Sequence, residues 1–543
     1  MAENSAPHPA SDPRPAPAVR RGGVRPLLAL ASLVPLALAV AAVSTTDRPD
    51  QTTIEHASAQ SQPGASTSWC PGPVTLPEEA LDAGSDDELG VTPPSAAISL
   101  RAVAAEPAAS VLFGRVSASQ TLQEEDGSVR APSISAEDAD GTVISDRPAS
   151  EDLGVSVLEE TSYTGRPHVS SATSEGGRAV ADSVQSTLTA DGDYRSLSLT
   201  RCSEPATEAT FLGVSTGTGS SSVLVLRNPT ERPATASVQL WTADGPASME
   251  GRSQVVVAPG EEQRVLLESV APGQDAVGVG VSVLGAPLSM HVQSTERDGL
   301  TPGGAEILAP LAAADTELLM PGVDVAGTDP ALVLANSQGS DTSASVEVVG
   351  QDGPVDAAAL EEIDVPAGTV VSTPLEGLPD GTYSVVVRSE APLTAVTRSV
   401  RTGEKLAGDT LGAPVDFALV SPAPAIGSQA LTALPGQGSV GQLTLIGTED
   451  SAVTVVPIAA DGSAGEPIDL EVSAESTASL TSDQLEVGGR RAVGVTVVPE
   501  VPGSVHAGWT QREGGGENPS LISSFPVLPV QGGQDAVTVQ VAR

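Results

Sequence analysis

Short runs in which apolar and polar residues alternate recur along most of the chain, and acidic or glycine-rich turns separate them. Between residues 91 and 202 these runs are Ala97–Val103, Ser110–Val116, Gly154–Leu158 and Tyr194–Thr200. A period of two with β-branched residues is typical of β-strands. The pattern therefore predicts an all-β chain whose first β-rich domain covers residues 69–206. Within it, Gln120–Arg147 is acidic and polar enough to be expected as a mobile loop.

From residue 207 onward the chain repeats its own pattern. The segment LVLRN at Leu224–Asn228 returns 108 residues later as LVLAN at Leu332–Asn336, and LTLIG at Leu443–Gly447 follows after another 111. Markers that keep their order at a nearly constant offset indicate copies of one unit. We predict three β-sandwich repeats, over residues 207–312, 313–420 and 421–543, the last of which ends in a strand at Ala536–Val541.

An Asp-Gly pair follows an apolar strand in each of these repeats. The pairs are Asp244-Gly245, Asp352-Gly353 and Asp461-Gly462. A type I′ hairpin turn needs a positive φ at both central positions, which aspartate tolerates and glycine adopts freely. The sequence therefore predicts a tight hairpin turn at each pair.

Each repeat has room for about seven strands. In the first repeat they are expected at Ser222–Leu226, Ser237–Thr242, Gln254–Ala258, Gln263–Glu268, Ala276–Val283, Leu288–Gln293 and Glu306–Ala309. Seven short strands in about 105 residues indicate an immunoglobulin-like sandwich. Propeller blades are the alternative, but a blade takes about 40–50 residues. The predicted fold class is thus all-β, with tandem immunoglobulin-like sandwiches after an N-terminal transmembrane or signal helix.

That helix is predicted from one long apolar run, Leu27–Val43, which follows three arginines. Seventeen residues span about 26 Å as a helix, the short limit for crossing a membrane. The positive flank predicts that residues 27–43 anchor the chain with residues 1–26 in the cytoplasm and everything after the anchor exported. The leader at 1–26 is rich in Pro, Ala and Arg, and residues 44–68 are polar without a period, so we expect a disordered leader and a disordered linker. A cleaved signal peptide is the other interpretation, since small residues at Ala37–Ala41 offer cleavage patterns. The expected location is a single-pass site in the cell membrane, or the outside if the segment is cleaved.

Charge narrows the range of partners. The 543 residues include 69 acidic and 26 basic side chains, and the formal net charge is −43. Binding to nucleic-acid phosphates needs clustered Lys and Arg, so a nucleic-acid partner is excluded, and anionic membrane surfaces are disfavoured for the same reason. The partners we expect are the membrane, through residues 27–43, and an envelope protein or glycan.

The two cysteines, Cys70 and Cys202, both follow the apolar run. An even cysteine count outside the cytoplasm favours a disulfide, which would close a loop across the first β-rich domain. Two free buried thiols are the alternative.

Motifs that carry chemistry are weak in this chain. Gly213–Gly217 matches G-x-S-x-G, but a Gly/Ser loop follows where a nucleophile elbow needs a helix. Asp138–Gly141 resembles half a calcium loop without the further ligands. The histidines show no metal-ligand spacing; they are His8, His56, His168, His291 and His506. We therefore predict no catalytic residue, no cofactor and no metal site.

Several of these residues also carry a resemblance. Trp69–Gly72 (WCPG), Arg201-Cys202 followed by Pro205 and Phe211, and the Leu-x-Leu-x-Asn-Pro run at Leu224–Pro229 resemble an uncharacterised family of exported actinobacterial proteins, known only as a domain of unknown function. A single lysine against 25 arginines suits a GC-rich genome. The resemblance implies a location in the cell envelope and brings no activity, ligand or catalytic residue.

Two functions are compatible with this sequence. The first is a non-enzymatic cell-envelope protein, a membrane-tethered rod of β-sandwiches that binds or spaces envelope components. The second is an envelope enzyme, or an accessory subunit of a glycan-processing enzyme, with its site in residues 69–206. That region lies outside the predicted repeats and is therefore free to be specialised. A cleft that gathers His168 with carboxylates would favour the enzyme.

Overall fold

Strands account for nearly all regular structure in the computed structural model. It describes residues 58–61, 65–76, 91–105, 133–139, 141–147, 155–163, 166–174, 178–249, 251, 253–355, 362–405, 412–436, 440–513, 520–530 and 537–540. The predicted leader 1–26, the apolar segment 27–43 and the strand at 110–116 lie outside the described residues. Within the described ranges, no helix has the length and hydropathy that a membrane crossing requires.

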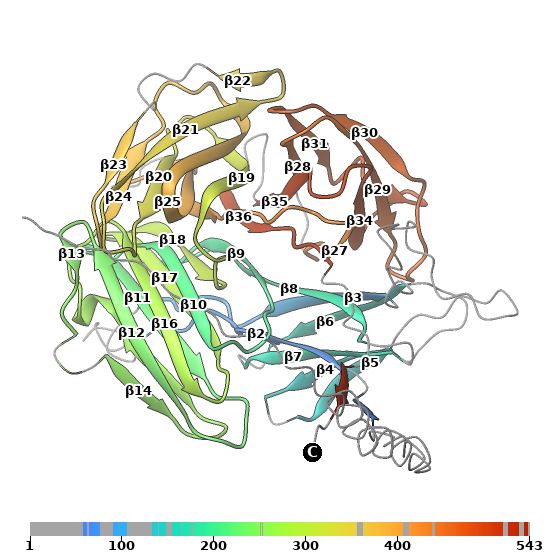
Figure 1. The fold of residues 1–543 in the computed structure, drawn as a ribbon, viewed down its shortest axis with the longest axis horizontal. Helices are drawn as coiled ribbons and strands as arrows, with labels where there is room; N and C mark the ends of the chain where they lie inside the picture. The colour runs from blue at the N-terminus through green and yellow to red at the C-terminus, as the bar shows by residue number, and fades with distance from the viewer. Residues whose placement is uncertain are drawn as a thin grey trace, which may run out of the picture. The chain divides into compact units, whose positions relative to one another are not determined.

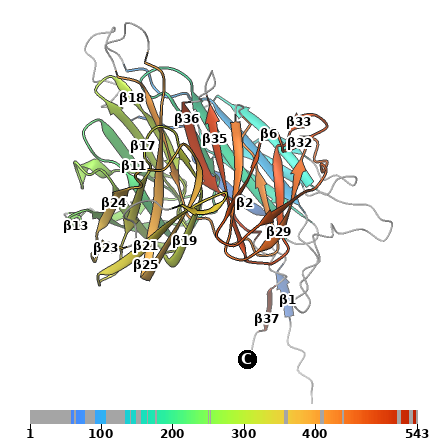
Figure 2. The same ribbon diagram turned by 90° about the horizontal axis from the view of Figure 1, so that it is seen from above.

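Two short strands near the chain ends form a sheet of their own. β1 (Ser58–Ser61) pairs with β37 (Val537–Gln540), and Figure 2 shows them side by side. The prediction that Ala536–Val541 completes the last repeat is therefore wrong, because its strand pairs with a segment of the predicted linker. Residues 61–537 make up a separate compact unit, to which the following paragraphs refer.

The first pair of sheets comes from residues 66–201. One sheet has the order β2 (Ser66–Cys70), β7 (His168–Thr173), β4 (Ser133–Asp138), β5 (Val143–Arg147), and the other β6 (Val155–Ser162), β3 (Ile98–Ala105), β8 (Val180–Thr189), β9 (Ser196–Arg201). The loop predicted at Gln120–Arg147 is wrong for residues 133–138 and 143–147, which are strands. Ile134 and Ala136 alternate into the core between the sheets in spite of their acidic neighbours.

The second pair contains every strand predicted for the first repeat. Its sheets are β10 (Glu208–Val214), β16 (Val277–Gly285), β12 (Ala234–Thr242), β13 (Gly245–Pro246), with β14 (Gln254–Val257) also on β12; and β15 (Glu262–Leu266), β11 (Ser220–Arg227), β17 (Ser289–Asp298), β18 (Thr301–Leu308). A short 3-10 turn, η1 (Leu267–Ser269), follows β15. Sequence reasoning missed β10, whose core side chains include Phe211 and Leu212.

The third and fourth pairs follow in the same manner. In the third pair, one sheet has the order β19 (Asp315–Val325), β25 (Gly381–Thr402), β21 (Thr342–Gly350), and both β22 (Gly353–Val355) and β23 (Ile363–Val365) pair with β21. The other sheet has the order β24 (Val370–Pro374), β20 (Ala331–Ala335), β25, β26 (Val415–Val420), so β25 belongs to both sheets. The fourth has β27 (Ala430–Ala433), β34 (Gly494–Pro499), β29 (Ser451–Ile458), β30 (Ile468–Val472); and β31 (Thr477–Thr481), β28 (Val440–Gly447), β35 (Val505–Glu513), β36 (Leu521–Pro526). A small separate hairpin of β32 (Glu486–Val487) and β33 (Arg490–Arg491) lies between β31 and β34 in the chain.

All four sheet pairs share one connectivity. The short strands β13, β22, β32 and β33 are left out of this count, and the long strand β25, which runs through both sheets of its pair, is counted twice. In chain order, the first, sixth, third and fourth strands then form one sheet, and the fifth, second, seventh and eighth form the other. Residues 69–206 therefore have the strand order of the three predicted repeats, although we expected them to lie outside the repeat. The order differs from the immunoglobulin fold, where the first strand joins the sheet of the second and the seventh joins that of the sixth. Here these two strands have exchanged sheets.

The eighth strand of each pair lies at the centre of the 61–537 unit. β9 contacts β18, β18 contacts β26, β26 contacts β36, and β36 contacts β9 again. Figure 1 shows the four sheet pairs arranged around the centre where these strands meet, and Figure 2 shows β36 beside β35 at the edge of its sheet. The four pairs thus close into a ring, so the expectation of a rod is wrong for this part of the chain.

The Asp-Gly pairs lie at tight turns, but not with type I′ geometry. Gly245 pairs with Thr242 across the turn and has a φ of 116°, and Gly353 pairs with Gly350 with a φ of 108°. Among the described residues, Glu475 is the one non-glycine with a positive φ, so each aspartate keeps an ordinary conformation. The glycine therefore follows the two central residues and takes the left-handed position of a bulge.

Candidate functional site

The four central strands enclose a buried polar junction. Glu306 on β18 accepts hydrogen bonds from Ser198 Oγ on β9 at 2.7 Å and from Ser523 Oγ on β36 at 2.6 Å. The backbone N–H of Ile307 donates to the same carboxyl at 3.1 Å. One side chain of the second sheet pair therefore connects the first pair to the fourth.

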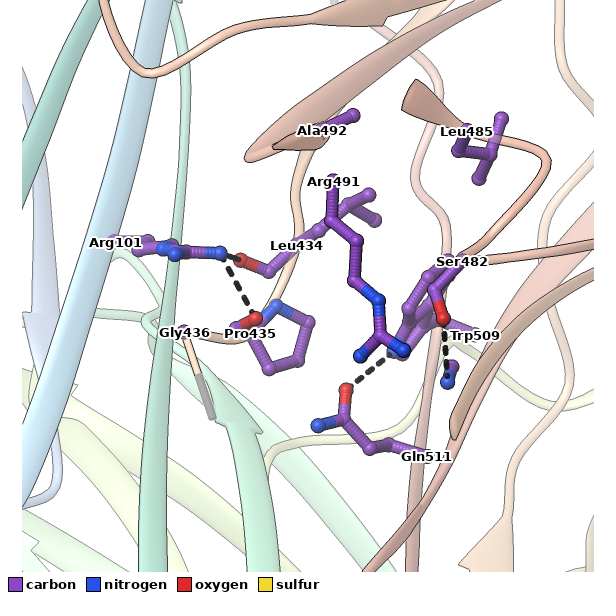
Figure 3. Close-up of a pocket in the computed structure, with 11 residues that line it drawn as sticks. Arg101, Leu434, Pro435, Gly436, Ser482, Leu485, Arg491, Ala492, Trp509 and Gln511 are labelled. Atoms are coloured by element: carbon purple, nitrogen blue, oxygen red, sulfur yellow. Dashed lines mark hydrogen bonds between the residues drawn. The ribbon is translucent and has the colours of Figure 1, made fainter. Parts of the chain in front are cut away.

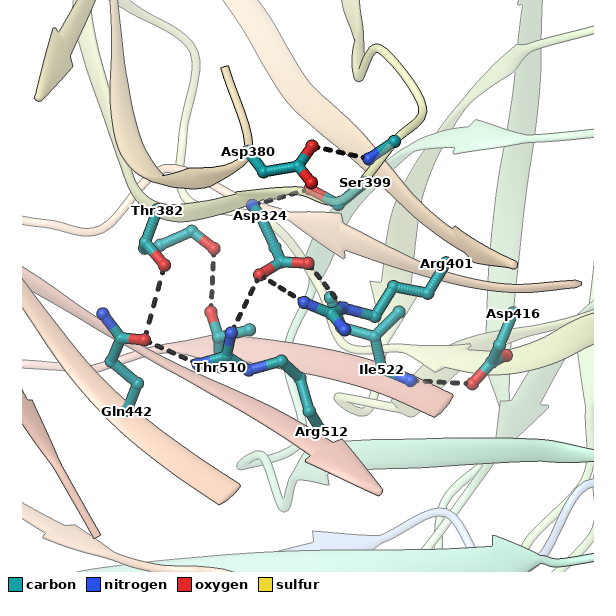
Figure 4. A network of polar contacts seen from close by, with 12 residues as sticks. Asp324, Asp380, Thr382, Ser399, Arg401, Asp416, Gln442, Thr510, Arg512 and Ile522 are labelled. Atoms are coloured by element: carbon teal, nitrogen blue, oxygen red, sulfur yellow. Dashed lines mark hydrogen bonds and ion pairs between the residues drawn. The ribbon is translucent and has the colours of Figure 1, made fainter. Parts of the chain in front are cut away.

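Asp416 on β26 makes the matching connection from the third sheet pair. Its Oδ2 accepts the backbone N–H of Leu197 on β9 at 3.1 Å and that of Ile522 on β36 at 3.0 Å. Figure 4 shows the second of these bonds. Each of the two carboxyl groups thus bridges the same two neighbouring strands, and together they tie all four sheet pairs at the centre.

Burial dominates the electrostatics of this junction. Glu306 is 4% exposed and Asp416 is fully enclosed. Desolvation raises the pKa of Glu306 well above its usual range, the hydrogen bonds from Ser523 and Ser198 oppose it in part, and the nearby Asp416 raises it further. Burial likewise raises the pKa of Asp416 well above its usual range, against backbone hydrogen bonds and the more distant charge of Arg195. Burial therefore favours the neutral form of both groups over the carboxylate.

The second oxygen of Asp416 packs closely against Gly304. Its Oδ1 has no hydrogen-bond partner among the described residues, and a Cβ atom added to Gly304 would lie 2.6 Å from it. Gly304 has a φ of 102°, so both its missing side chain and its backbone conformation are needed for β18 to pass this close. No group of three or more potential metal ligands occurs in the part of the chain that the structure describes.

A charged cluster lies where the third and fourth sheet pairs meet (Figure 4). Asp324 on β19, 2% exposed at its side chain, receives Arg401 Nε at 2.6 Å and Arg512 Nη1 at 3.2 Å. Arg512 also donates to Gln442 Oε1 at 2.7 Å. Burial lowers the pKa of Arg512, and Arg401 lowers it further, while Asp324 opposes both effects. One buried carboxylate thus forms ion pairs with two arginines.

Ion pairs also occur at the other contacts between sheet pairs. Arg297 of the second pair meets Asp193 of the first at 2.8 Å, and Arg398 of the third meets Glu296 of the second in a two-pronged contact at 2.7 and 2.8 Å. Arg201 bonds Asp182, and the same aspartate accepts the backbone N–H of Ala433 in the fourth pair at 2.9 Å. Each contact between neighbouring sheet pairs in the ring therefore includes an ion pair or a hydrogen bond.

A small hollow of about 80 Å³ opens between the first and fourth sheet pairs (Figure 3). The side chains that line it already have partners: Arg101 donates to the carbonyls of Leu434 and Pro435, and Trp509 Nε1 donates to Gln511 at 3.2 Å. Ligand pockets are usually several times larger. The hollow is therefore a gap in the packing between the first and fourth sheet pairs.

The other residues singled out in the sequence lie apart from the central junction. His168 is buried on β7 opposite Cys70, and burial lowers its pKa. Burial lowers the pKa of His291 to about 3, and that of His506, whose Nδ1 meets the carbonyl of Ala423 at 2.7 Å, is also lowered. His8 and His56 lie outside the described residues. The G-x-S-x-G stretch begins with the last two residues of β10 and continues into a loop, in which Ser215 donates to the carbonyl of Gln274.

The two cysteines are joined. A disulfide connects Cys70, at the end of β2, to Cys202, directly after β9. Backbone hydrogen bonds between Trp69 and Ser203, at 2.8 and 3.0 Å, flank it. The link therefore fastens β2, an edge strand of one sheet, to β9 at the centre of the ring.

The comparisons with known proteins connect this architecture to a sequence family. The model of a family of unknown function, DUF5719, matches residues 157–483, which is more than half of the chain. The chain belongs to the DUF5719 family. A search of curated proteins found no match to the sequence.

The region matched to DUF5719 contains Glu306, Asp416 and Asp324, which sequence reasoning missed. Each of the first two is a single acidic residue in an apolar strand, Ala305–Leu308 and Val415–Val420. That pattern is a usable signal, because a lone carboxyl on a buried strand needs partners from elsewhere in the fold. What those partners are cannot be read locally: Ser198 and Ser523 lie 108 and 217 residues away, about one and two repeat lengths.

Proposed function

We propose that this protein is a non-enzymatic component of the cell envelope, tethered through residues 27–43, whose ring of sheet pairs binds or spaces envelope components. The observation that carries the proposal is the closed centre. Glu306 and Asp416 bond the first and fourth sheet pairs from the second and third. A ring sealed in this way offers a rigid outer surface and is suited to holding partners at fixed positions.

The disulfide and the charge support an exported location. Disulfides persist in oxidising compartments, and Cys70 and Cys202 are joined and buried. A net charge of −43 keeps the molecule soluble and repels other anionic surfaces. The family resemblance to exported actinobacterial proteins points the same way. We therefore place the ring outside the membrane.

The alternative, an envelope enzyme or accessory subunit of a glycan-processing enzyme with a site in residues 69–206, has lost its main argument. It rested on that region being different from the repeats, and the region has the same strand order. His168, which the alternative needed in a cleft with carboxylates, is 1% exposed within a sheet. The absence of catalysis itself stays a prediction.

Topology and partner contact can be tested together in cells that express the full-length protein. Protease added to intact cells or spheroplasts should digest the ring and leave a membrane-bound fragment near residues 27–60. Full protection of the ring would contradict an external location, and recovery of the intact chain in the medium, starting near residue 40, would replace the anchor with a cleaved signal.

Cross-linking on the same cells tests the binding role. Linked peptides should join the outer strands of the ring to other envelope proteins or to wall glycan. An exposed ring that gives only internal cross-links would contradict the proposal.

A further inference from the structure

Within the described part of the chain, the two carboxyl groups at the centre of the ring lack ion-pair partners. The cations on the strands packed around them are engaged elsewhere: Arg201 with Asp182, Arg297 with Asp193, Arg398 with Glu296, and Arg401 and Arg512 with Asp324. β36 carries no titratable side chain, Glu513 on β35 accepts from Gln511, and His291 on β17 is neutral because burial lowers its pKa to about 3. Arg195, ahead of β9, donates to Ser520.

We propose that Glu306 and Asp416 form a proton-dependent lock: each holds a proton while the four central strands are closed, and rising pH opens the junction between β9 and β36. The geometry supports this because both groups bridge these two strands and both are sealed from water. Oδ1 of Asp416, packed against Gly304 without a partner among the described residues, is the atom that carries its proton. On opening, each proton passes to solvent and leaves a hydrated carboxylate.

The direction of the effect follows from proton linkage. Burial raises the pKa of both carboxyls in the folded protein, whereas in the open chain they titrate near pH 4. Between pH 4 and the raised folded pKa, the closed state holds more protons than the open state, so its stability falls as pH rises. The contribution is fully present below about pH 4. Within the window, each carboxyl makes the opening equilibrium about tenfold more favourable per pH unit.

Few other groups titrate in the same window. Ordinary surface carboxylates are ionised above about pH 5.5, and the pKa values of His168, His291 and His506 are lowered. The net charge therefore changes little between about pH 6.5 and 8.5, and general charge repulsion adds little to the pH dependence.

Hydrogen exchange of the full-length protein tests the lock directly. The amide N–H groups of Leu197 and Ile522 donate to Asp416, and that of Leu199 donates to Ser523 beside Glu306. Their protection, relative to an unstructured peptide at the same pH, should fall as pH rises from about 6.5, by about tenfold per pH unit for each carboxyl that is still protonated in the closed state. Protection of the amides of β29 and β30, on the outer side of the fourth pair, should stay nearly constant.

Neutral variants supply the second measurement. Glu306→Gln and Asp416→Asn keep the shape of the protonated acids, so each should reduce the pH slope, and the double variant should abolish it. Matched controls are Glu471→Gln and Asp364→Asn, which remove the same charge from exposed strand positions and should leave the slope unchanged. A pH-independent wild-type protection at β9 and β36 would overturn the proposal even if no variant folds. So would an unchanged slope in a folded double variant.

Discussion

Replacing Asp324 with asparagine should destabilise the contact between the third and fourth sheet pairs more than any exposed charge change. The carboxylate is 2% exposed and receives Arg401 and Arg512 together. The introduced amide would turn an N–H donor toward one of the two guanidinium groups and remove the buried negative charge that both contact. Breaking a buried ion pair by removing one partner costs about 3–5 kcal/mol, so we expect a loss of that size in the free energy of unfolding.

Urea denaturation of the full-length protein at pH 7 measures this cost, with Glu317→Gln as the matched control. Glu317 also pairs with an arginine, Arg388, but the two side chains are 49% and 44% exposed, and Arg388 keeps Glu347 as a second partner. In this control, the free energy of unfolding should fall by less than about 1 kcal/mol. Arg512→Met, which leaves the contact between Asp324 and Arg401 intact, should cost less than Asp324→Asn. Equal losses for Asp324→Asn and the control would refute the reasoning.

Three further predictions test other parts of the fold. Replacing Cys70 and Cys202 with alanine opens a loop of 132 residues and should cost up to about 5 kcal/mol by loop entropy; a loss below about 1 kcal/mol in urea denaturation would contradict it. Trp241 covers Gly280, where an added Cβ would lie 2.5 Å from the indole. Trp241→Ala should therefore lower the free energy of unfolding by about 3–5 kcal/mol, and Gly280→Ala should also destabilise the protein. Normal melting of both variants would show that this contact is unimportant. Because the net charge is −43, the melting temperature should rise smoothly with NaCl as screening increases, and CaCl₂ at equal ionic strength should add little; a calcium effect that saturates below about 1 mM would reveal a built metal site.

Local sequence patterns were sufficient for the strands and poor for the turns. The alternation in Ala276–Val283 predicted a strand correctly, because the pleat places successive side chains on opposite faces. The apolar run in Ser222–Leu226 did so as well, because this strand is buried on both faces. The Asp-Gly pairs located the turns, but not their type, since the same residues suit both a type I′ turn and a type I turn with a glycine bulge. Glu208–Val214 was missed because its pattern is short and its contacts lie in a distant strand, β16.

What the sequence by itself determined is the all-β class, the repeat length of about 108 residues and the presence of two cysteines to join. These properties depend on neighbours within a few residues or on simple counting. The tertiary structure alone decided that residues 69–206 share the strand order of the repeats, that the ring closes, and that Glu306 and Asp416 meet at its centre. The bonds of Glu306 to Ser198 and Ser523 span 108 and 217 residues. No local period encodes such contacts, because they arise from how equivalent strands of different repeats pack together.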